Sequence, residues 1–407
     1  MDAREPLVID GATLAGGAAA ARLAKAGHAV ELVDAGPAGG HWATTTTDVG
    51  DVDHLPPVIR LPAAWRDLFR KSGRTLDAEL NRAHLELREA PPARHRFDDG
   101  FELTLPTERG RQWHAVAEAF SPATADRWLA VNDECDELWQ YLRFHGTERP
   151  YVALDPLPAR RGLRNALSRR RTETRDGAPT TTLHELADRA GDPHLATIVL
   201  DHASLAGTDR LDTAPALLGS RLAVERIFGR WHLADADGPL PASVLVTLLS
   251  DRLDLRGVLR VSLPTQTAML TTQVVPDGRP PALAPTITHT LTDTAPPEGI
   301  VETVDHTSRG PIVSWARASR PDGGTLVSRH DHTATRPDPV WGLAPESLDA
   351  WRSRPTLRPT PDPHWHASAA SHAGNEPWAE ILSAALAVYE VHEHLTGADI
   401  RPTNKAQ

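Results

Sequence analysis

Three residues near the start of the chain have the spacing of a turn that holds phosphate groups. Gly11, Thr13 and Gly16 occupy the glycine positions of the pattern G-x-G-x-x-G, with threonine in the middle. In that pattern the outer glycines allow a tight turn and close packing of helix on strand, and the helix N-terminus presents unpaired N–H groups to a diphosphate. Asp34 lies 23 residues after Gly11, where a carboxylate can accept hydrogen bonds from an adenosine ribose. These four residues predict a dinucleotide-binding site.

Thr13 is the departure from this pattern that matters most. The middle glycine normally lets the backbone approach the phosphates without a Cβ in the way, and a β-branched residue obstructs that approach. Two interpretations follow from the sequence: an altered dinucleotide site, or a buried alanine-rich helix after a core strand with no dinucleotide bound. We expect the first.

The elements that must position these residues form a strand, a turn, a helix and a second strand. Residues 7–9 are a short apolar run, residues 14–26 are an alanine-rich segment that Gly27 ends, and residues 29–33 are a second apolar run that leads to Asp34. A helix that joins two strands in this way predicts a parallel βαβ unit.

Farther along the chain the pattern changes several times. The segment up to about residue 200 is mostly helical, with a hairpin expected at Asp98 to Gly100. A helix and a short strand are expected at residues 242–261, antiparallel strands at 265–330 and an irregular proline-rich connection at 335–363.

The last expected element is a long helix over residues 376–395. Its apolar residues recur at helical spacing, Asn375 is a candidate N-cap, and Gly397 follows the end. Glu376 at its start has two possible roles: stabilisation of the helix dipole, which we favour, or general acid–base chemistry beside His372.

Both ends of the chain resemble the phytoene desaturase and amine oxidase class of FAD-dependent oxidoreductases. The resemblance lies in L-V-I-D-G-A-T-L-A-G-G-A-A-A-A-R-L-A-K-A-G-H-A-V-E-L-V-D at residues 7–34, in the pair Gly39 and Gly40, and in S-H-A-G-N-E-P-W-A-E-I-L-S-A at residues 371–384. It hardly covers the middle third. Three departures fall at positions that contact flavin in the class: Thr13, His41 in place of an arginine, and Asn375–Glu376 in place of glycines.

The resemblance implies FAD as cofactor and assigns site residues. The expected cofactor-binding residues are Gly11, Thr13, Gly16, Asp34, Gly39, Gly40, His41, Gly374 and Asn375. The expected catalytic residues beside the flavin ring are His372, Glu376 and Trp378.

The predicted fold class is α/β: a Rossmann-like FAD/NAD(P)-binding domain with an inserted helix-rich and antiparallel-sheet substrate domain. The dinucleotide-binding domain is expected in three parts, and the substrate domain in two. The boundaries, in chain order, are 1–65 (dinucleotide), 66–220 (helix-rich substrate), 221–264 (dinucleotide), 265–335 (antiparallel-sheet substrate) and 336–407 (dinucleotide).

Two functions are compatible with these features. The first is an FAD-dependent oxidoreductase, desaturase-like or amine-oxidase-like, that acts on a lipophilic or secondary-metabolic small molecule. The second is a cofactor-free descendant of the same fold that binds a small molecule or a partner, or acts as a non-redox isomerase.

Composition excludes several other classes. A formal net charge of −11 argues against a nucleic-acid partner. The arginines between residues 160 and 175 could meet an anionic lipid or an acidic partner or, as we favour, form a solvated helix face or loop. Cys135 is the single cysteine, so no disulfide or cysteine-based metal site is possible within the chain.

No metal site is expected, although His330 with His332 and His364 with His366 form H-x-H pairs. A G-x-S-x-G elbow and a P-loop are absent from the sequence. With no signal-peptide pattern and no apolar run of membrane-spanning length, we expect a cytoplasmic protein with at most peripheral membrane contact.

Overall fold

The computed structural model describes residues 5–33, 36, 39–149, 181–273, 278–319, 323–359, 363–368 and 374–402. Three expectations therefore fall outside the described residues: Asp34 as a ribose ligand, His372 as a catalytic residue, and the arginine-rich segment between residues 160 and 175.

The first sheet is parallel and joins segments from both ends of the chain. Its strand order is β11-β2-β1-β12-β17. The strands are β1 (Leu7–Asp10), β2 (Val30–Val33), β11 (Leu259–Val261), β12 (Leu270–Thr271) and β17 (Trp365–His366). Each neighbouring pair runs parallel, as a Rossmann-like unit requires. The predicted α/β fold class is confirmed.

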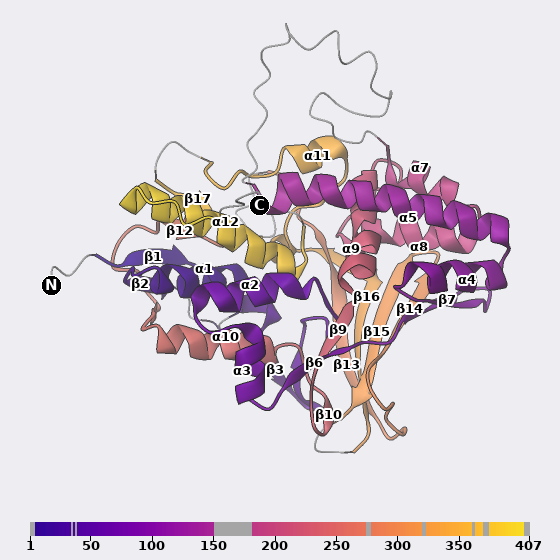
Figure 1. Cartoon of the computed structure of the whole chain (residues 1–407), viewed down its shortest axis with the longest axis horizontal. Helices are drawn as coiled ribbons and strands as arrows, with labels where there is room; N and C mark the ends of the chain where they lie inside the picture. Colours follow the sequence, from indigo (N-terminus) through magenta and orange to yellow (C-terminus); the bar gives the residue numbers. More distant parts are fainter. Residues whose placement is uncertain are drawn as a thin grey trace, which may run out of the picture.

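Helices cover this sheet, as the left half of Figure 1 shows. Helix α1 (Leu14–Lys25) contacts α12 (Pro377–Thr396), α10 (Val244–Leu255) and α2 (Pro62–Ser72). The alanines of α1 at positions 18–21 are fully buried, and small side chains there allow the neighbouring helices to approach closely. The first and last helices of the described chain are thus neighbours.

The second sheet has six strands and lies in the other half of the molecule (Figure 1). Its order is β13-β16-β15-β14-β7-β8, and only β14 and β7 pair in parallel within it. The strands are β7 (Ala93–Phe97), β8 (Glu102–Leu105), β13 (Leu283–Thr292), β14 (Val301–Thr307), β15 (Gly310–Ala318) and β16 (Thr325–Pro337). Strands β7 and β8 form the hairpin that the sequence predicts.

Four helices accompany the second sheet: α4 (Arg109–Ala119), α5 (Pro122–Leu142), α8 (Pro193–Leu205) and α9 (Ser220–Phe228). Helix α8 contacts β14 and β15, and α5 contacts α4 and α9. A small sheet of β5 (Ile59–Arg60), β6 (Glu86–Glu89), β9 (Arg230–Asp235) and β10 (Gly238–Pro239) and a hairpin of β3 (Thr44–Thr47) with β4 (Gly50–Asp53) complete the strands. The short helices are α3 (Leu76–Arg82), α7 (Leu183–Ala187) and α11 (Leu348–Arg352).

The sheets and helices differ from the expected boundaries in two places. Strand β12 belongs to the first sheet, although we expected the antiparallel part to begin at residue 265. Helix α9 contacts α5, although residues 221–264 were expected in the dinucleotide-binding domain. Pairing with β1 and packing on α5 are long-range interactions, which local patterns do not specify.

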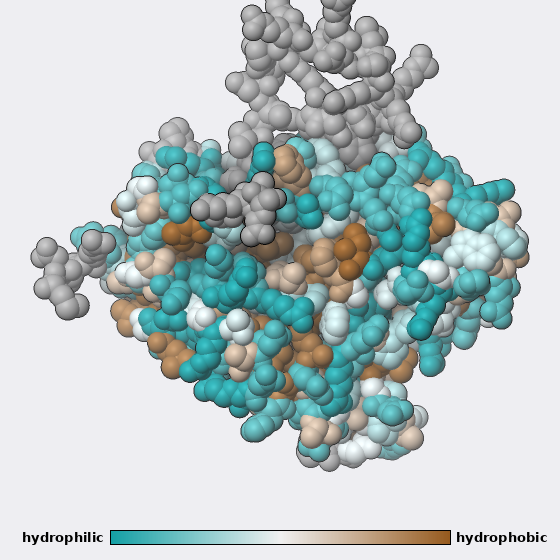
Figure 2. Space-filling model, viewed as in Figure 1, coloured by the Kyte–Doolittle hydropathy of each residue, from teal (hydrophilic) through white to brown (hydrophobic). Residues whose placement is uncertain are grey.

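The molecular surface in Figure 2 is mostly hydrophilic, and its hydrophobic residues form separate small patches. Among the described residues, no helix is both long enough and apolar enough to cross a membrane.

Candidate active site and cofactor site

The turn after β1 has the backbone conformation that its glycines predict. Gly11 has a φ of +103°, in the region that favours glycine. A Cβ built on Gly16 would lie 1.9 Å from the backbone oxygen of Gly11, so a side chain at this position is excluded. Both outer glycines therefore have the structural roles expected from the sequence.

Thr13 closes this turn with its hydroxyl group. It is the N-cap of α1, and its Oγ1 accepts a hydrogen bond from the backbone N–H of Gly16 at 3.1 Å. The same hydroxyl donates to Thr272 Oγ1 at 2.9 Å, and Thr272 donates to the carbonyl oxygen of Gly11 at 2.8 Å. Threonine is a favoured N-cap, so this residue stabilises the helix in the absence of any ligand.

The second glycine pair lies directly on this turn. The N–H of Gly39 donates to the carbonyl oxygen of Ala12 at 2.8 Å, and Gly39 forms a parallel bridge with Thr13. A Cβ on Gly40 would lie 3.3 Å from Thr13 Cα. The structure thus brings four expected cofactor-binding residues, Thr13, Gly39, Gly40 and the adjacent His41, to the N-terminus of α1.

His41 contains the orphan polar atoms of this region. Both of its ring nitrogens are buried and lack a hydrogen-bond partner within the described part of the chain. Burial, with a smaller contribution from His54, lowers its pKa to about 3, so the imidazole is neutral. Its ring contacts that of Trp42, with centroids 4.1 Å apart.

A carboxylate that the sequence did not point to also lies at this N-terminus. Glu380 of α12 is buried, and Trp42 Nε1 donates a hydrogen bond to its Oε1 at 2.8 Å. The backbone N–H of Ala15, in the first turn of α1, lies close enough to this carboxyl group to lower its pKa. Burial raises the pKa of Glu380 to about 7, against the opposing effects of these two donors.

These contacts test whether the region fits the diphosphate of a dinucleotide. A helix N-terminus with glycine-rich walls is a site for an anion. The structure already has an acidic side chain there, that of Glu380. The donors therefore fit a phosphate, and an internal side chain stands in its place.

The start of α12 differs from the prediction. Glu376, not Asn375, is the N-cap residue, and its side chain makes no capping hydrogen bond. Its carboxylate forms an ion pair with Arg221 of α9, which also donates to Asn375 Oδ1 at 3.4 Å. Glu376 therefore lies at the N-terminus of α12, where the helix dipole favours a carboxylate, but its side chain pairs with Arg221 and makes no capping hydrogen bond.

Of the other residues expected beside the flavin ring, Trp378 lies near Glu376 but does not line the main cavity. Trp378 is buried, with its ring against that of Trp139 at a centroid distance of 5.8 Å. It lines two smaller cavities, whereas Glu376 also lines the largest one. Gly374 and Asn375 lie just before α12, next to Glu376.

The main cavity lies between the second sheet and α8 and α9. It has about 1180 Å³ of space between protein atoms, including its open mouth. Its wall combines apolar side chains with many charged and polar ones, and two tryptophans, Trp42 and Trp341, also line it. The apolar residues include Ile198, Leu205, Leu222, Val304 and Val313.

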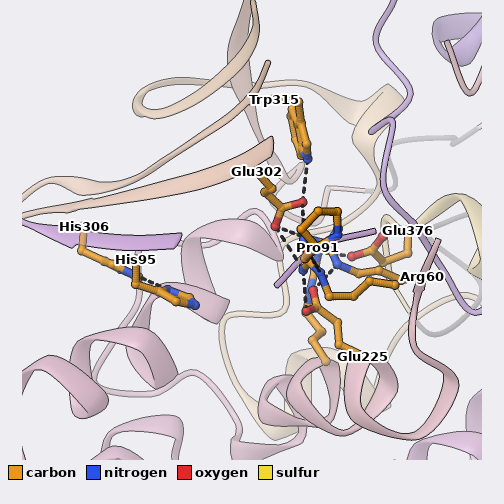
Figure 3. A network of polar contacts seen from close by, with 10 residues as sticks. Arg60, Pro91, His95, Glu225, Glu302, His306, Trp315 and Glu376 are labelled. Carbon is orange, nitrogen blue, oxygen red and sulfur yellow. Dashed lines mark hydrogen bonds and ion pairs between the residues drawn. The ribbon is translucent and has the colours of Figure 1, made fainter. Parts of the chain in front are cut away.

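A network of buried charges lies at one side of this cavity (Figure 3). Arg60 of β5 pairs with Glu225 of α9 and, at 3.2 Å, with Glu302 of β14. Arg230 of β9 joins the same two carboxylates at 2.8 and 3.2 Å, and Trp315 Nε1 donates to Glu302 at 2.6 Å. Two guanidinium groups thus balance two carboxylates and connect the small sheet to the second sheet.

The charges in this network stabilise one another. Burial opposes ionisation of Glu225, but Arg60 and Arg230 hold its pKa far below its ordinary value. Burial also disfavours charge on Arg60, whereas Glu225 and Glu302 raise its pKa above the ordinary value. Arg60, Arg230 and Glu225 are therefore charged at neutral pH. Loss of one member of the network leaves its partners buried with less compensation.

A separate chain of hydrogen bonds connects a carboxylate with two histidines. Asp201 of α8 lies 2.6 Å from His306 Nδ1, and His306 Nε2 lies 2.8 Å from His95 Nδ1. Figure 3 shows the two imidazoles side by side, and all three residues line the main cavity. If His306 donates from Nδ1 to the carboxylate, its Nε2 accepts from His95, which leaves the Nε2 lone pair of His95 for another partner.

Burial changes the pKa values of Asp201 and His95 in this chain of hydrogen bonds, which we call the relay. It raises the pKa of Asp201 and, together with His306, holds the pKa of His95 well below its ordinary value. His95 is thus neutral and able to accept a proton. The arrangement is that of an oriented base supported by a second imidazole and a carboxylate.

Other histidines also line the cavity. Both ring nitrogens of His202 are buried and have no partner in the described part of the chain. His330 contacts the ring of Trp315, and His332 Nδ1 lies 3.1 Å from the carbonyl oxygen of Ser204. No group of three or more metal ligands occurs among the described residues.

Sequence comparisons place the N-terminal unit among known families. A family described as an NAD(P)-binding Rossmann-like domain matches residues 9–72. The hydroxyneurosporene desaturase of Cereibacter sphaeroides is 39% identical over 152 residues, which are 37% of this chain and 27% of that protein. The matched part is therefore about a quarter of the length of this curated relative. The resemblance to the phytoene desaturase class is confirmed.

Solved structures share the fold across nearly the whole chain. A putrescine oxidase double mutant covers 95% of this chain and 98% of its own, with a TM-score of 0.59 and 13% identity. An oxidoreductase from Methanosarcina mazei covers 96% and 100%, with a TM-score of 0.58 and 12% identity. A fatty acid isomerase from P. acnes covers 95% and 98%, with a TM-score of 0.54 and 10% identity. At these identities the similarity shows the fold.

Proposed function

We propose that the protein is an FAD-dependent oxidoreductase, desaturase-like or amine-oxidase-like, that transforms a small molecule in the main cavity. The class of the matched desaturase supports this proposal, as does a fold shared with an oxidase and an oxidoreductase. The site residues and the reaction are inferences from this chain's own geometry.

One observation carries the proposal. Trp42 donates to the carboxylate at the N-terminus of α1 and also lines the main cavity. A single side chain therefore separates the dinucleotide turn from the space that can hold a substrate. In a flavoenzyme of this fold the cofactor must reach from the first of these places to the second.

The residues that would hold FAD are those of the N-terminal turn and of the loop on it. Gly11 and Gly16 shape the turn, and Thr13, Gly39 and Gly40 surround the helix N-terminus. Asp34, His41, Gly374 and Asn375 complete the proposed cofactor set. When bound, a flavin supplies a hydride acceptor.

The lining of the cavity suits a lipophilic small molecule with a polar group. Apolar side chains would contact its body, while the unpaired imidazole of His202 and the relay would meet its polar part. An oxidation that removes a hydride from carbon also releases a proton. His95, backed by His306 and Asp201, is placed to accept that proton. Glu376 faces the same cavity and orients Arg221.

The visible spectrum of the purified protein tests this proposal. Bound flavin gives a yellow protein, and added FAD should bind to any cofactor-free fraction. Candidate amines and unsaturated lipids are then added without oxygen, and bleaching of the flavin band identifies a substrate. A colourless protein that binds no added FAD overturns the proposal.

A second function is favoured by Glu380 and Thr13. Because Thr13 bonds to the N–H of Gly16 and the carboxyl group of Glu380 lies beside the N–H of Ala15, the chain has a complete turn without a dinucleotide. In that case the relay would move a proton between two positions of one substrate, as in a redox-neutral isomerase. Substrate-dependent deuterium incorporation from D₂O in flavin-free protein would support this alternative, and its absence would reject it.

A further inference from the structure

The N-terminus of α1 is filled from within the chain. The N–H of Gly16 bonds to Thr13 Oγ1, the N–H of Gly17 bonds to the carbonyl oxygen of Thr13, and the carboxyl group of Glu380 lies close enough to the N–H of Ala15 for that N–H to lower its pKa. A helix N-terminus attracts a carboxylate for the same reason that it attracts a phosphate. The donors that the sequence assigned to a diphosphate therefore have partners.

The position of Glu380 is determined by tight packing of helices. Helix α12 lies against α1, and Ala379, Ser383 and Ala384 around Glu380 are fully buried. Glu380 is in the first turn of α12, so its side chain cannot move away without displacing the helix or changing rotamer in a filled space. Trp42, also fully buried, fixes the carboxylate from the other side.

Charge makes this arrangement selective against a dinucleotide. Above about pH 7, where this buried carboxyl group ionises, a diphosphate would meet a like charge in a poorly solvated site. Below that pH the side chain competes by occupying the space. The raised pKa of Glu380 is consistent with an environment that already disfavours its charge. The ring nitrogens of His41, next to Trp42, are buried and have no hydrogen-bond partner among the described residues, so this region still offers unused hydrogen-bonding atoms.

We propose that the Glu380 side chain occupies the place of the cofactor's diphosphate and competes with it. Wild-type protein therefore binds FAD weakly, and removal of this carboxylate opens the site. This inference rests on the proposed function only in its choice of FAD as the dinucleotide. It identifies an internal competitor of cofactor binding.

The test compares FAD binding by the full-length wild type, Glu380→Gln and Glu380→Ala, measured by flavin fluorescence or calorimetry. Glu390→Gln is the matched control, because Glu390 is also on α12 and accepts a hydrogen bond from an indole N–H, that of Trp365 at 3.2 Å. We expect Glu380→Ala to bind FAD at least tenfold more tightly, Glu380→Gln to gain affinity to a smaller extent because its amide still fills the space, and Glu390→Gln to bind FAD as the wild type does. Circular dichroism verifies that each variant is folded, and the near-isosteric Gln variant provides the result if Ala disturbs packing.

ADP and adenosine locate the effect. ADP contains the diphosphate without the flavin, and adenosine contains neither, so the Glu380 variants should gain affinity for ADP and not for adenosine. Equal gains for both, or FAD binding no tighter than that of the wild type, would overturn the inference. A variant that binds FAD tightly while no substrate reduces it supports the inference and counts against the proposed oxidoreductase function.

Discussion

The buried carboxyl group of Glu380 should leave a signature in the pH dependence of stability. Its pKa rises from an ordinary value of 4.5 to about 7, chiefly because of burial. Each unit of pKa corresponds to about 1.4 kcal/mol, so ionisation of this group destabilises the folded state by about 3 kcal/mol at most. Replacement of Glu380 by glutamine should remove that contribution.

The sign follows from proton binding. Between about pH 4.5 and pH 7 the folded state retains the Glu380 proton, whereas the unfolded state has lost it. The wild type should therefore lose stability relative to Glu380→Gln as pH rises through this window, with no further change above it. Buried histidines such as His41 and His202, whose pKa values burial lowers to about 3, have the opposite effect up to about pH 6.5. They are present in both proteins and cancel in the difference.

Urea unfolding at a series of pH values from 4.5 to 8, followed by tryptophan fluorescence, gives the free energy of unfolding of each protein. Glu390→Gln, the variant at the second indole-bonded carboxylate of α12, is measured in parallel and should behave as the wild type does. A difference between the wild type and Glu380→Gln that stays constant across this range would refute the reasoning, because it would mean that the carboxyl group ionises normally.

Three further outcomes are expected. Asp201→Asn should lower turnover by about 100-fold and shift the pH profile with little change in KM, because the relay loses the carboxylate that orients it; an unchanged profile would remove Asp201 from the mechanism. Gly16→Ala should abolish soluble folded protein, since its Cβ would lie 1.9 Å from a backbone oxygen of the same turn, whereas Gly299→Ala, with no atom within 4 Å of the added Cβ, should fold normally. Glu302→Gln should cost roughly 3–5 kcal/mol in urea unfolding, because Arg230 stays buried with less compensation; a loss below about 1 kcal/mol would contradict the assigned role.

The elements that the sequence predicts correctly are defined by local patterns. The βαβ unit follows from two apolar runs around an alanine-rich helix that ends before glycine, and α12 follows from its helical spacing and Gly397. The hairpin of β7 and β8 follows from its turn residues. In each case hydrophobic periodicity and glycine suffice, since the interactions lie within a few residues of one another.

The functional residues that the sequence did not reveal are connected over long distances in the chain. Asp201, His306 and His95 lie on three elements, and nothing in their local sequence links them. A signal did exist in β14, where Glu302 and His306 occupy buried positions that alternate with partly buried ones. Charged or titratable residues at the buried positions of a strand indicate a polar interior site.

The site around α1 shows a different limit. The fingerprint correctly identified the turn, but the residue that fills it is on a helix more than 350 positions later, at Glu380. Glutamate in the first turn of a helix normally stabilises that helix's own dipole, so sequence alone assigns it a local role. Only the packing of α12 on α1 shows that its carboxylate serves the N-terminus of another helix.

Because α1 packs on α12, the ribosome completes α1 long before the helix that covers it. Helix α1 ends at Lys25 and α12 begins at Pro377. At a synthesis rate of about 5–20 residues per second, the ribosome adds α12 roughly 20 to 70 s after α1. Until then the part of α1 that α12 covers is exposed, and the N–H of Ala15 has no carboxyl group of Glu380 beside it. If Glu380 acts as we propose, a nascent chain could bind a dinucleotide before its own carboxylate arrives, and the flavin content of the finished protein would depend on when the cofactor was available.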